Sequence, residues 1–165
     1  MSAAAVPCII VVVHTHTEED EMSLEQNKAI ARRHFEELWH MGNLDVADEI
    51  YSSRAVGHYS DNPDLTGYPD DERELVRADK VAFPDGRVTV QAQIAEGDIV
   101  VTRWRFDATH AGPLYDIPPS GRRISVAGVH VHRIDRGKIV EIWAHPDTLS
   151  FMSQMGLLPT TANVG

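Results

Sequence analysis

The chain has 165 residues, a hydrophobic fraction of 42% and a formal net charge of −10. This length suits one domain, and the hydrophobic fraction is enough for a packed core rather than a disordered chain. An acidic chain without a block of Lys or Arg argues against nucleic acid and membranes as partners, because both need a basic surface. The single cysteine, Cys8, excludes an intramolecular disulfide and fits a reducing, cytoplasmic setting.

The start of the chain is set apart from the predicted domain. Residues 5–13 are apolar but too short to span a bilayer, and they lack the charge pattern of a signal peptide, because Lys28 is the first basic residue. This segment is either an added edge strand or sequence upstream of the domain, and the second interpretation is favoured. We therefore expect an N-terminal extension, one domain and a C-terminal tail, over residues 1–21, 22–158 and 159–165.

Helical patterns come first along the predicted domain. A first helix is predicted to begin at Ser23, which forms a capping-box pattern with Gln26. Apolar residues then recur at helical spacing for about 18 residues, until Gly42. The segment 43–51 predicts a short second helix with its apolar residues turned inward.

A long irregular stretch separates these helices from the next helical pattern. Residues 52–71 are rich in Gly, Pro, Asn and Asp, which is typical of a loop that walls a pocket. Residues 72–83 resume a helical pattern, and Pro84 stops it. At the other end of the domain, a last helix is predicted to begin with Asp147 as its N-cap and to end at Gly156.

Between these helices, a period of two predicts an antiparallel sheet. Alternating apolar and polar residues mark four strands, over 87–94, 99–106, 123–134 and 138–144. Turn residues join the first two strands and the last two, and a proline-rich loop connects the pairs. Helices followed by such strands predict an α+β fold, with the helices packed on one face of a curved sheet. The concavity of that sheet is where a small ligand would bind.

Several short motifs follow one another in the second half of the chain. They are Phe83-Pro84-Asp85, Ala95-Glu96-Gly97-Asp98, Thr109-His110-x-Gly112, Pro118-Pro119-x-Gly121-Arg122, Arg133-Ile134-x-x-Gly137-Lys138-Ile139-x-Glu141-x-Trp143 and Gln154-x-Gly156. In this order they resemble the SnoaL-like polyketide cyclase family, also called ester cyclases, over about Leu24 to Gly156. The resemblance implies a cone-shaped fold like that of nuclear transport factor 2, in which helices and a curved sheet enclose a deep apolar pocket. It also raises the expectation of a homodimer.

The same resemblance implies an activity. The family includes cofactor-free aldol cyclases of aromatic polyketides, relatives tied to hydroxylation and proteins of unassigned activity. The cyclases use a pocket aspartate as general acid/base, helped by a histidine on a neighbouring strand. Here Ala144 stands at the position of that aspartate, whereas His130 matches the strand histidine.

We therefore expect a cofactor-free enzyme that binds a hydrophobic, oxygenated small molecule of secondary metabolism, such as an antibiotic precursor. The expected chemistry is aldol-type cyclisation or isomerisation by acid/base catalysis. Because the usual aspartate is missing, a hydrolase, a dehydratase or a hydroxylation-assisting enzyme on the same scaffold is an alternative. A non-catalytic ligand-binding protein is another.

Three residues are candidates for catalysis. His130 is the first, because histidine exchanges protons near neutral pH; the competing interpretation is a core histidine with its hydrogen bonds satisfied. His145 follows Ala144 and could replace the aspartate if a bulge re-aimed it, although strand alternation points it away. Asp147 has the position of an ordinary helix N-cap and could orient a histidine as well.

Candidates for substrate binding come from strands and loops expected near the pocket. They are His58, Tyr59, Trp104, Phe106, His110, His132 and Trp143. His132 shares a strand face with His130, since they are two residues apart. By spacing alone this pair and a distant Asp could hold a metal, but nine histidines make such coincidences common, and no metal is expected.

Overall fold

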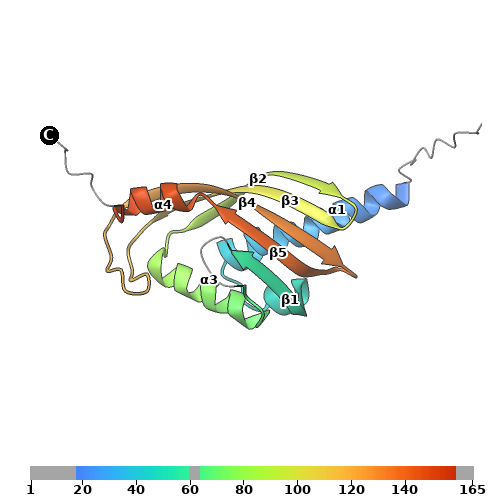
Figure 1. Cartoon of the computed structure of the whole chain (residues 1–165), viewed down its shortest axis with the longest axis horizontal. Coiled ribbons are helices and arrows are strands. Elements are labelled where there is room, and N and C mark those ends of the chain that lie inside the picture. Colours follow the sequence, from blue (N-terminus) through green and yellow to red (C-terminus); the bar gives the residue numbers. More distant parts are fainter. Residues whose placement is uncertain (1–17, 60–63, 159–165) are drawn as a thin grey trace, which may run out of the picture.

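The fold is known from a computed structural model, which describes residues 18–59 and 64–158. In chain order the elements are α1 (Glu18–Arg33), the π-helix η1 (His34–His40), α2 (Val46–Ile50), β1 (Tyr51–Tyr59), α3 (Asp70–Ala82), β2 (Arg87–Glu96), β3 (Ile99–Thr109), β4 (Arg123–Asp135), β5 (Lys138–Pro146) and α4 (Thr148–Met155). The strands form one sheet in the order β1-β5-β4-β3-β2. Figure 1 shows this sheet as a curved layer, with α1 and α3 beside it and α4 beyond the end of β5.

These elements confirm the predicted α+β fold, with helices packed on a curved sheet. The strands expected at the two hairpins are present as β2 to β5. The last helix also follows the prediction, because the Asp147 side chain accepts a hydrogen bond from the Ser150 amide at 2.9 Å and Gly156 ends α4 with φ at 76°. None of the helices in the described ranges is long and apolar enough to cross a membrane.

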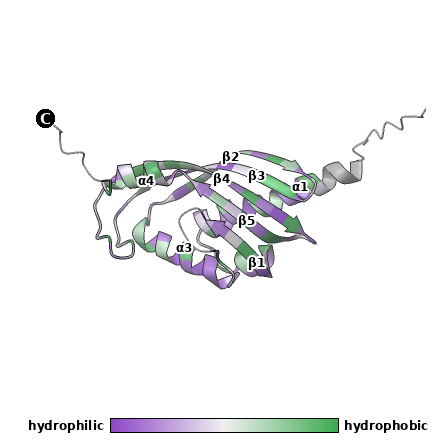
Figure 2. Ribbon diagram, in the orientation of Figure 1, coloured by the Kyte–Doolittle hydropathy of each residue, from purple (hydrophilic) through white to green (hydrophobic). Residues whose placement is uncertain are grey.

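The alternation along the strands decides which side chains reach the interior. On β4 every second residue from Ile124 to Ile134 is buried, which places His130 and His132 on the inner face as predicted. His130 pairs with Thr102 on one side and with Ala144 on the other. Figure 2 shows the alternation as hydrophobic and hydrophilic bands along the sheet.

The core joins the helices to the sheet in two clusters. The larger one includes Leu38, Val46, Ile50, Val76, Val100, Ile139 and Ile142. The smaller one includes Phe83, Ala108, Val126 and Met155. Burial of each large aliphatic or aromatic side chain contributes roughly 1.5–3 kcal/mol. Together the two clusters hold η1, α3 and α4 in fixed positions against the sheet.

Strand β1 is the main departure from the prediction. Residues 52–59, expected to be irregular, pair in parallel with β5, and Tyr59 lies opposite Ala144. The local signal is weak because Ser, Arg and Gly interrupt the apolar pattern, and the register shifts between Tyr51 and Val56. Pairing with the neighbouring strand therefore overrides a low local propensity.

The first helix also differs from the prediction. α1 already contains Ser23, so this residue is not an N-cap. The helix begins instead at Glu18, so residues 18–21 belong to it. Apart from these four positions, the predicted extension 1–21 and the tail 159–165 lie outside the described residues.

Candidate active site

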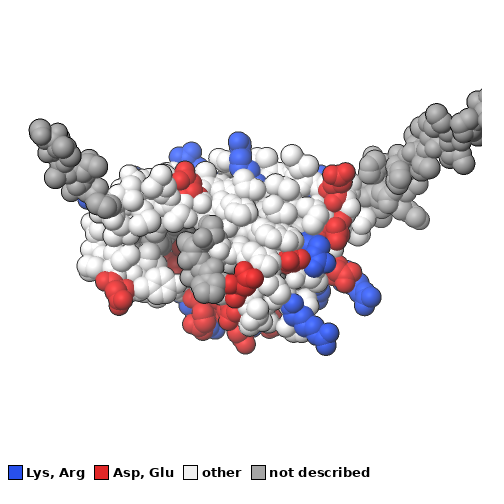
Figure 3. All heavy atoms as spheres, in the orientation of Figure 1, with Lys and Arg blue, Asp and Glu red and all other residues white. Residues whose placement is uncertain are grey.

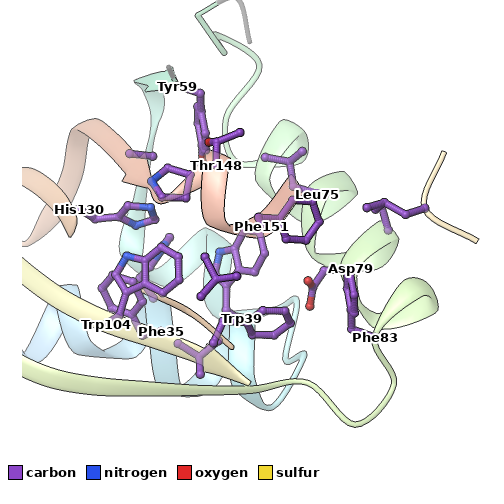
Figure 4. A pocket seen from close by; sticks show the side chains of 18 of the residues that line it. Phe35, Trp39, Tyr59, Leu75, Asp79, Phe83, Trp104, His130, Thr148 and Phe151 are labelled. Carbon is purple, nitrogen blue, oxygen red and sulfur yellow. The ribbon is translucent and has the colours of Figure 1, made fainter. Parts of the chain in front are cut away.

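A pocket of about 260 Å³ lies between the inner face of the sheet, η1, α3 and α4. Its wall is formed by His34, Phe35, Trp39, Tyr59, Leu75, Ala78, Asp79, Phe83, Val88, Trp104, Phe106, Leu114, Tyr115, Val126, His130, Ala144, Pro146, Thr148 and Phe151. Most of these side chains are apolar. Figure 4 shows Asp79 on the α3 side of the pocket and His130 and Trp104 on the strand side.

Asp79 is the acidic group of this pocket. Among the residues that the structure describes, it is the only carboxylic acid in the pocket wall. Its Oδ2 atom is buried without a hydrogen-bond partner in the described part of the chain. Burial raises the pKa of Asp79 to about 7, and the nearby Lys80 acts against that rise. A carboxyl with this pKa exchanges protons at neutral pH.

Sequence reasoning missed Asp79, although the chain carries a signal for it. In the predicted helix, Leu75, Asp79 and Phe83 follow one another at intervals of four residues, so they share one helix face. Leu75 and Phe83 also line the pocket. A carboxylate between two apolar residues on the same face of a helix is unusual, because burial of an unpaired charge is costly.

His130 lies across the pocket from α3, on β4. It is buried, and its Nδ1 atom has no hydrogen-bond partner among the described residues. Burial lowers the pKa of His130 well below the ordinary value, and the neighbouring His132 and His145 act in the same direction. The ring is therefore neutral at pH 7, a state that can donate one hydrogen bond and accept one but does not supply a proton as an imidazolium.

His34 joins His130 and His132 in a cluster of three buried imidazoles. The ring centre of His34 lies 5.3 Å from that of His130 and 4.9 Å from that of His132. Burial lowers the pKa of His132 to about 3 and the pKa of His34 well below its ordinary value. His34 could not be recognised from the sequence, because it occupies the stripe of apolar residues on the first helix, between Ile30 and Leu38.

A buried carboxylate lies behind this cluster. Glu72 of α3 is fully buried and accepts hydrogen bonds from Trp39 at 2.7 Å, Tyr59 at 2.9 Å and Tyr68 at 3.0 Å. Burial raises the pKa of Glu72, while these hydrogen bonds act against the rise. The aromatic donors fix the position of the carboxylate next to His34, whose Nδ1 lies 3.7 Å from Oε1.

The sequence profile of the SnoaL-like polyketide cyclase family matches residues 29–155. The chain belongs to this family. The match spans the helices, the sheet and α4, and so it includes every part of the pocket wall. It confirms the resemblance that the ordered motifs indicate. No curated protein matches the chain.

Solved structures of SnoaL-like proteins share this fold. AclR of Streptomyces galilaeus, a proposed hydroxylase, is 28% identical, with 86% of this chain and 87% of that chain covered and a TM-score of 0.72. A proposed SnoaL-like polyketide cyclase of Jannaschia sp. CCS1 is 26% identical over 82% and 94% of the two chains, with a TM-score of 0.74. IdmH of Streptomyces antibioticus, a proposed polyketide cyclase, is 27% identical over 79% and 99%, with a TM-score of 0.67.

The position at which the family resemblance implies an aspartate lies inside the pocket of this SnoaL-like protein. Ala144 is fully buried in the pocket wall, opposite His130 on the next strand. The following residue, His145, is exposed and does not line the pocket. The pairing of β5 with β4 has no bulge from Ala144 to Pro146 that would turn His145 inward. Asp147 is also exposed and caps α4.

The predicted substrate-binding residues divide into two groups. Tyr59, Trp104 and Phe106 line the pocket, whereas the others do not: His58, His110, His132 and Trp143. His58 forms ion pairs with Asp64 and Glu141, at 3.0 and 2.9 Å, and stacks on Trp143. His110 is buried behind the pocket, with Nδ1 at 3.0 Å from the Ser120 hydroxyl, and His132 lies within the histidine cluster.

The outer surface adds no basic site on the face shown in Figure 3. Acidic side chains gather there along the edge that α3 forms, while Lys and Arg are scattered. The first turn of α3 carries Asp70 and Asp71, while Glu72 in the same turn is buried.

Proposed function

We propose that this SnoaL-like protein is an acid/base enzyme for an oxygenated, largely apolar small molecule, with Asp79 as its general acid/base. The observation that carries the proposal is the carboxyl of Asp79 in the apolar pocket, with one oxygen buried and unpaired. A general acid/base works best when its pKa is near the working pH. Asp79 meets this condition, because burial raises its pKa to about 7.

The reaction class that suits these groups is proton transfer next to a carbonyl. Ionised Asp79 takes a proton from the carbon beside the carbonyl, and the electron pair of that C–H bond forms an enolate. His130, on the opposite wall, donates an N–H hydrogen bond to the enolate oxygen. The enolate then attacks a second carbonyl in an aldol-type cyclisation or is protonated at another carbon in an isomerisation, and Asp79 returns the proton.

Deuterium exchange tests this role without knowledge of the natural substrate. Aromatic ketones such as α-tetralone are first selected by the rise in melting temperature that they cause, and exchange of their α-hydrogens in D₂O is then followed by NMR. Replacement of a general base lowers the rate by roughly 10²-fold or more, so we expect this loss in Asp79→Asn. Glu74→Gln, an exposed acid on the same helix, is the control and should keep the wild-type rate.

Two outcomes would contradict the proposal. Equal exchange rates in folded Asp79→Asn and wild type would exclude Asp79 as the base. Ketones that bind to the wild-type protein without any exchange would leave a ligand-binding protein as the better description.

A hydroxylation-related reaction is the second candidate. AclR, which is similar to this chain, is a proposed hydroxylase. Ala144 also removes the carboxylate on which the family's aldol cyclases rely. In that case the pocket would bind an enolisable aromatic substrate, and Asp79 would remove a proton to make its ring or side chain electron-rich.

A further inference from the structure

We propose that His34, His130 and His132 bind one divalent transition-metal ion, with zinc as the first choice. This inference goes beyond the proposed function, since a proton-transfer enzyme does not need a metal. The site lies where η1 meets β4, beside the pocket. Three independent features of the described residues support it: the spacing of the rings, their unpaired nitrogens and the groups behind them.

The spacing of the three rings is that of a metal site. One nitrogen from each histidine lies within 4.8 Å of the others. The ring centres are 5.3, 4.9 and 5.8 Å apart. Three imidazoles on tetrahedral zinc, with Zn–N distances of about 2.0–2.1 Å, have ring centres about 5 Å apart and nitrogens about 3.3 Å apart. The rings are therefore at the required separation, and small rotations would turn the nitrogens inward.

Each of the three histidines has a buried nitrogen that lacks a partner among the described residues. These atoms are Nε2 of His34, Nδ1 of His130 and both ring nitrogens of His132. Buried polar atoms in folded proteins are nearly always hydrogen-bonded, because loss of hydration is otherwise uncompensated. A metal ion at the centre of the cluster would bind one nitrogen from each ring and so provide a partner for three of these four atoms.

The groups behind His34 are those that usually support a metal ligand. His34 Nδ1 and the Tyr51 hydroxyl share a hydrogen bond of 2.5 Å, and Oε1 of Glu72 lies 3.7 Å from the same nitrogen. If Nδ1 is the donor in the bond with Tyr51, it carries the proton and Nε2 is left as the ligand atom. A metal-bound histidine commonly passes its other N–H to a carboxylate in this way, directly or through a partner.

Glu72 also places a carboxyl group next to the site. It is fully buried, and in the described ranges its hydrogen-bond partners are neutral aromatic residues, with no Lys or Arg among its ion pairs. A buried carboxylate without a cation is unfavourable. A divalent ion in the histidine cluster would supply the missing positive charge.

The donor set indicates what such an ion could do. Three histidines without a fourth protein ligand are typical of zinc sites that keep one position open for water or substrate. His34 and His130 both line the pocket, so the open position would face it. There the ion could polarise a carbonyl oxygen of a bound molecule as a Lewis acid. This catalytic role rests on the proposed function, whereas metal binding itself does not.

The test measures binding rather than activity. The full chain, freed of any affinity tag, is stripped with a chelator and titrated with Zn²⁺ by calorimetry and with Co²⁺ by visible spectroscopy. We expect one ion per chain and the intense visible bands of four-coordinate Co²⁺. Loss of an outer-shell partner typically costs 10–100-fold in affinity, so we expect about that loss in Tyr51→Phe and a loss above ~100-fold in His132→Gln.

Matched controls separate this site from other histidines. His110→Gln removes an equally buried histidine outside the cluster and should leave the affinity unchanged. A His14→Ala/His16→Ala variant excludes the two histidines near the N-terminus and should also bind normally. If His132→Gln does not fold, ¹⁵N NMR of the wild-type imidazoles during the Zn²⁺ titration replaces it. Absence of stoichiometric binding to the wild type, or equal affinity in folded His132→Gln, would overturn the proposal.

Discussion

The residue opposite His130 is an alanine, so β5 presents no carboxyl at this point of the pocket wall. Ala144 is the cross-strand neighbour of His130, and directly paired positions bring their Cβ atoms to roughly 4.5–5.5 Å. A carboxylate at position 144 would therefore lie beside the His130 ring. In this chain the carboxyl enters from α3 instead, on Asp79. The pocket thus has two walls that could carry an acid, β5 and α3, and among the described residues only α3 carries one.

An aspartate at position 144 should take over part of the role that we propose for Asp79 on α3. In an Asp79→Asn background we expect Ala144→Asp to restore part of the lost deuterium exchange, because the new carboxylate faces the same pocket. Ala144→Asn in that background has nearly the same shape but no basic oxygen, and it should remain inactive. Exchange is measured by NMR as for Asp79→Asn. Equal rates for the Asp and Asn variants would show that a carboxyl on β5 does not reach the reacting carbon.

The sequence was enough for some site residues and not for others. His130 and His132 could be placed on one inner face because strand alternation is strict. Asp79 and His34 are also in periodic segments, but a helix face tells only that a residue is buried, and not which cavity it meets. The histidine cluster depends on the approach of η1 to β4, which no local pattern contains.

At the scale of elements, the sequence predicts helices whose ends are marked by local capping residues. It does not predict a strand whose conformation depends on pairing with another strand. α4 has an N-cap at Asp147 and a left-handed C-cap at Gly156, so its ends are local. β1 is held by parallel pairing with β5 and carries a weak pattern of its own. The π-helical form of η1 is likewise not encoded by a simple period, although such turns often occur near functional sites.

The cap of α4 gives a prediction about stability rather than chemistry. Asp147→Ala should lower the free energy of unfolding by about 1 kcal/mol, since the hydrogen bond to the Ser150 amide is lost. Asp147→Asn keeps a capping oxygen and should be close to wild type. Chemical denaturation measures the difference. A large loss of deuterium exchange in both folded variants would instead assign Asp147 a part in the reaction.

For the whole molecule, the same packing that forms the apolar pocket also buries acidic side chains, which burial disfavours in their charged form. The sheet and the helices enclose apolar walls, and they also bury acidic groups that would be more stable in water. Asp79 and Glu72 both have raised pKa values for this reason. Asp85, which is exposed, and Asp107, which is half-buried, have lowered pKa values, because hydrogen bonds from Thr109 and Ser125 favour their charged forms. The two groups give opposite dependences of stability on pH.

The contribution of Asp79 can be isolated by comparing wild type with Asp79→Asn. Its pKa is about 7 in the folded protein and 3.8 in the reference state, so folding favours the protonated form. This contribution to stability is complete below about pH 4 and is lost as pH rises through about 7. Each pKa unit corresponds to about 1.4 kcal/mol, so the asparagine variant should gain on wild type by up to a few kcal/mol between these limits. The pH-dependent contributions of the acids with lowered pKa values cancel in the comparison, because these acids are unchanged in both proteins.

Chemical denaturation across this pH range measures the difference, with Glu74→Gln as the exposed control on α3. A constant difference between wild type and Asp79→Asn would mean that the Asp79 carboxyl is hydrated rather than buried, and its proposed role as a base at neutral pH would lose its physical ground.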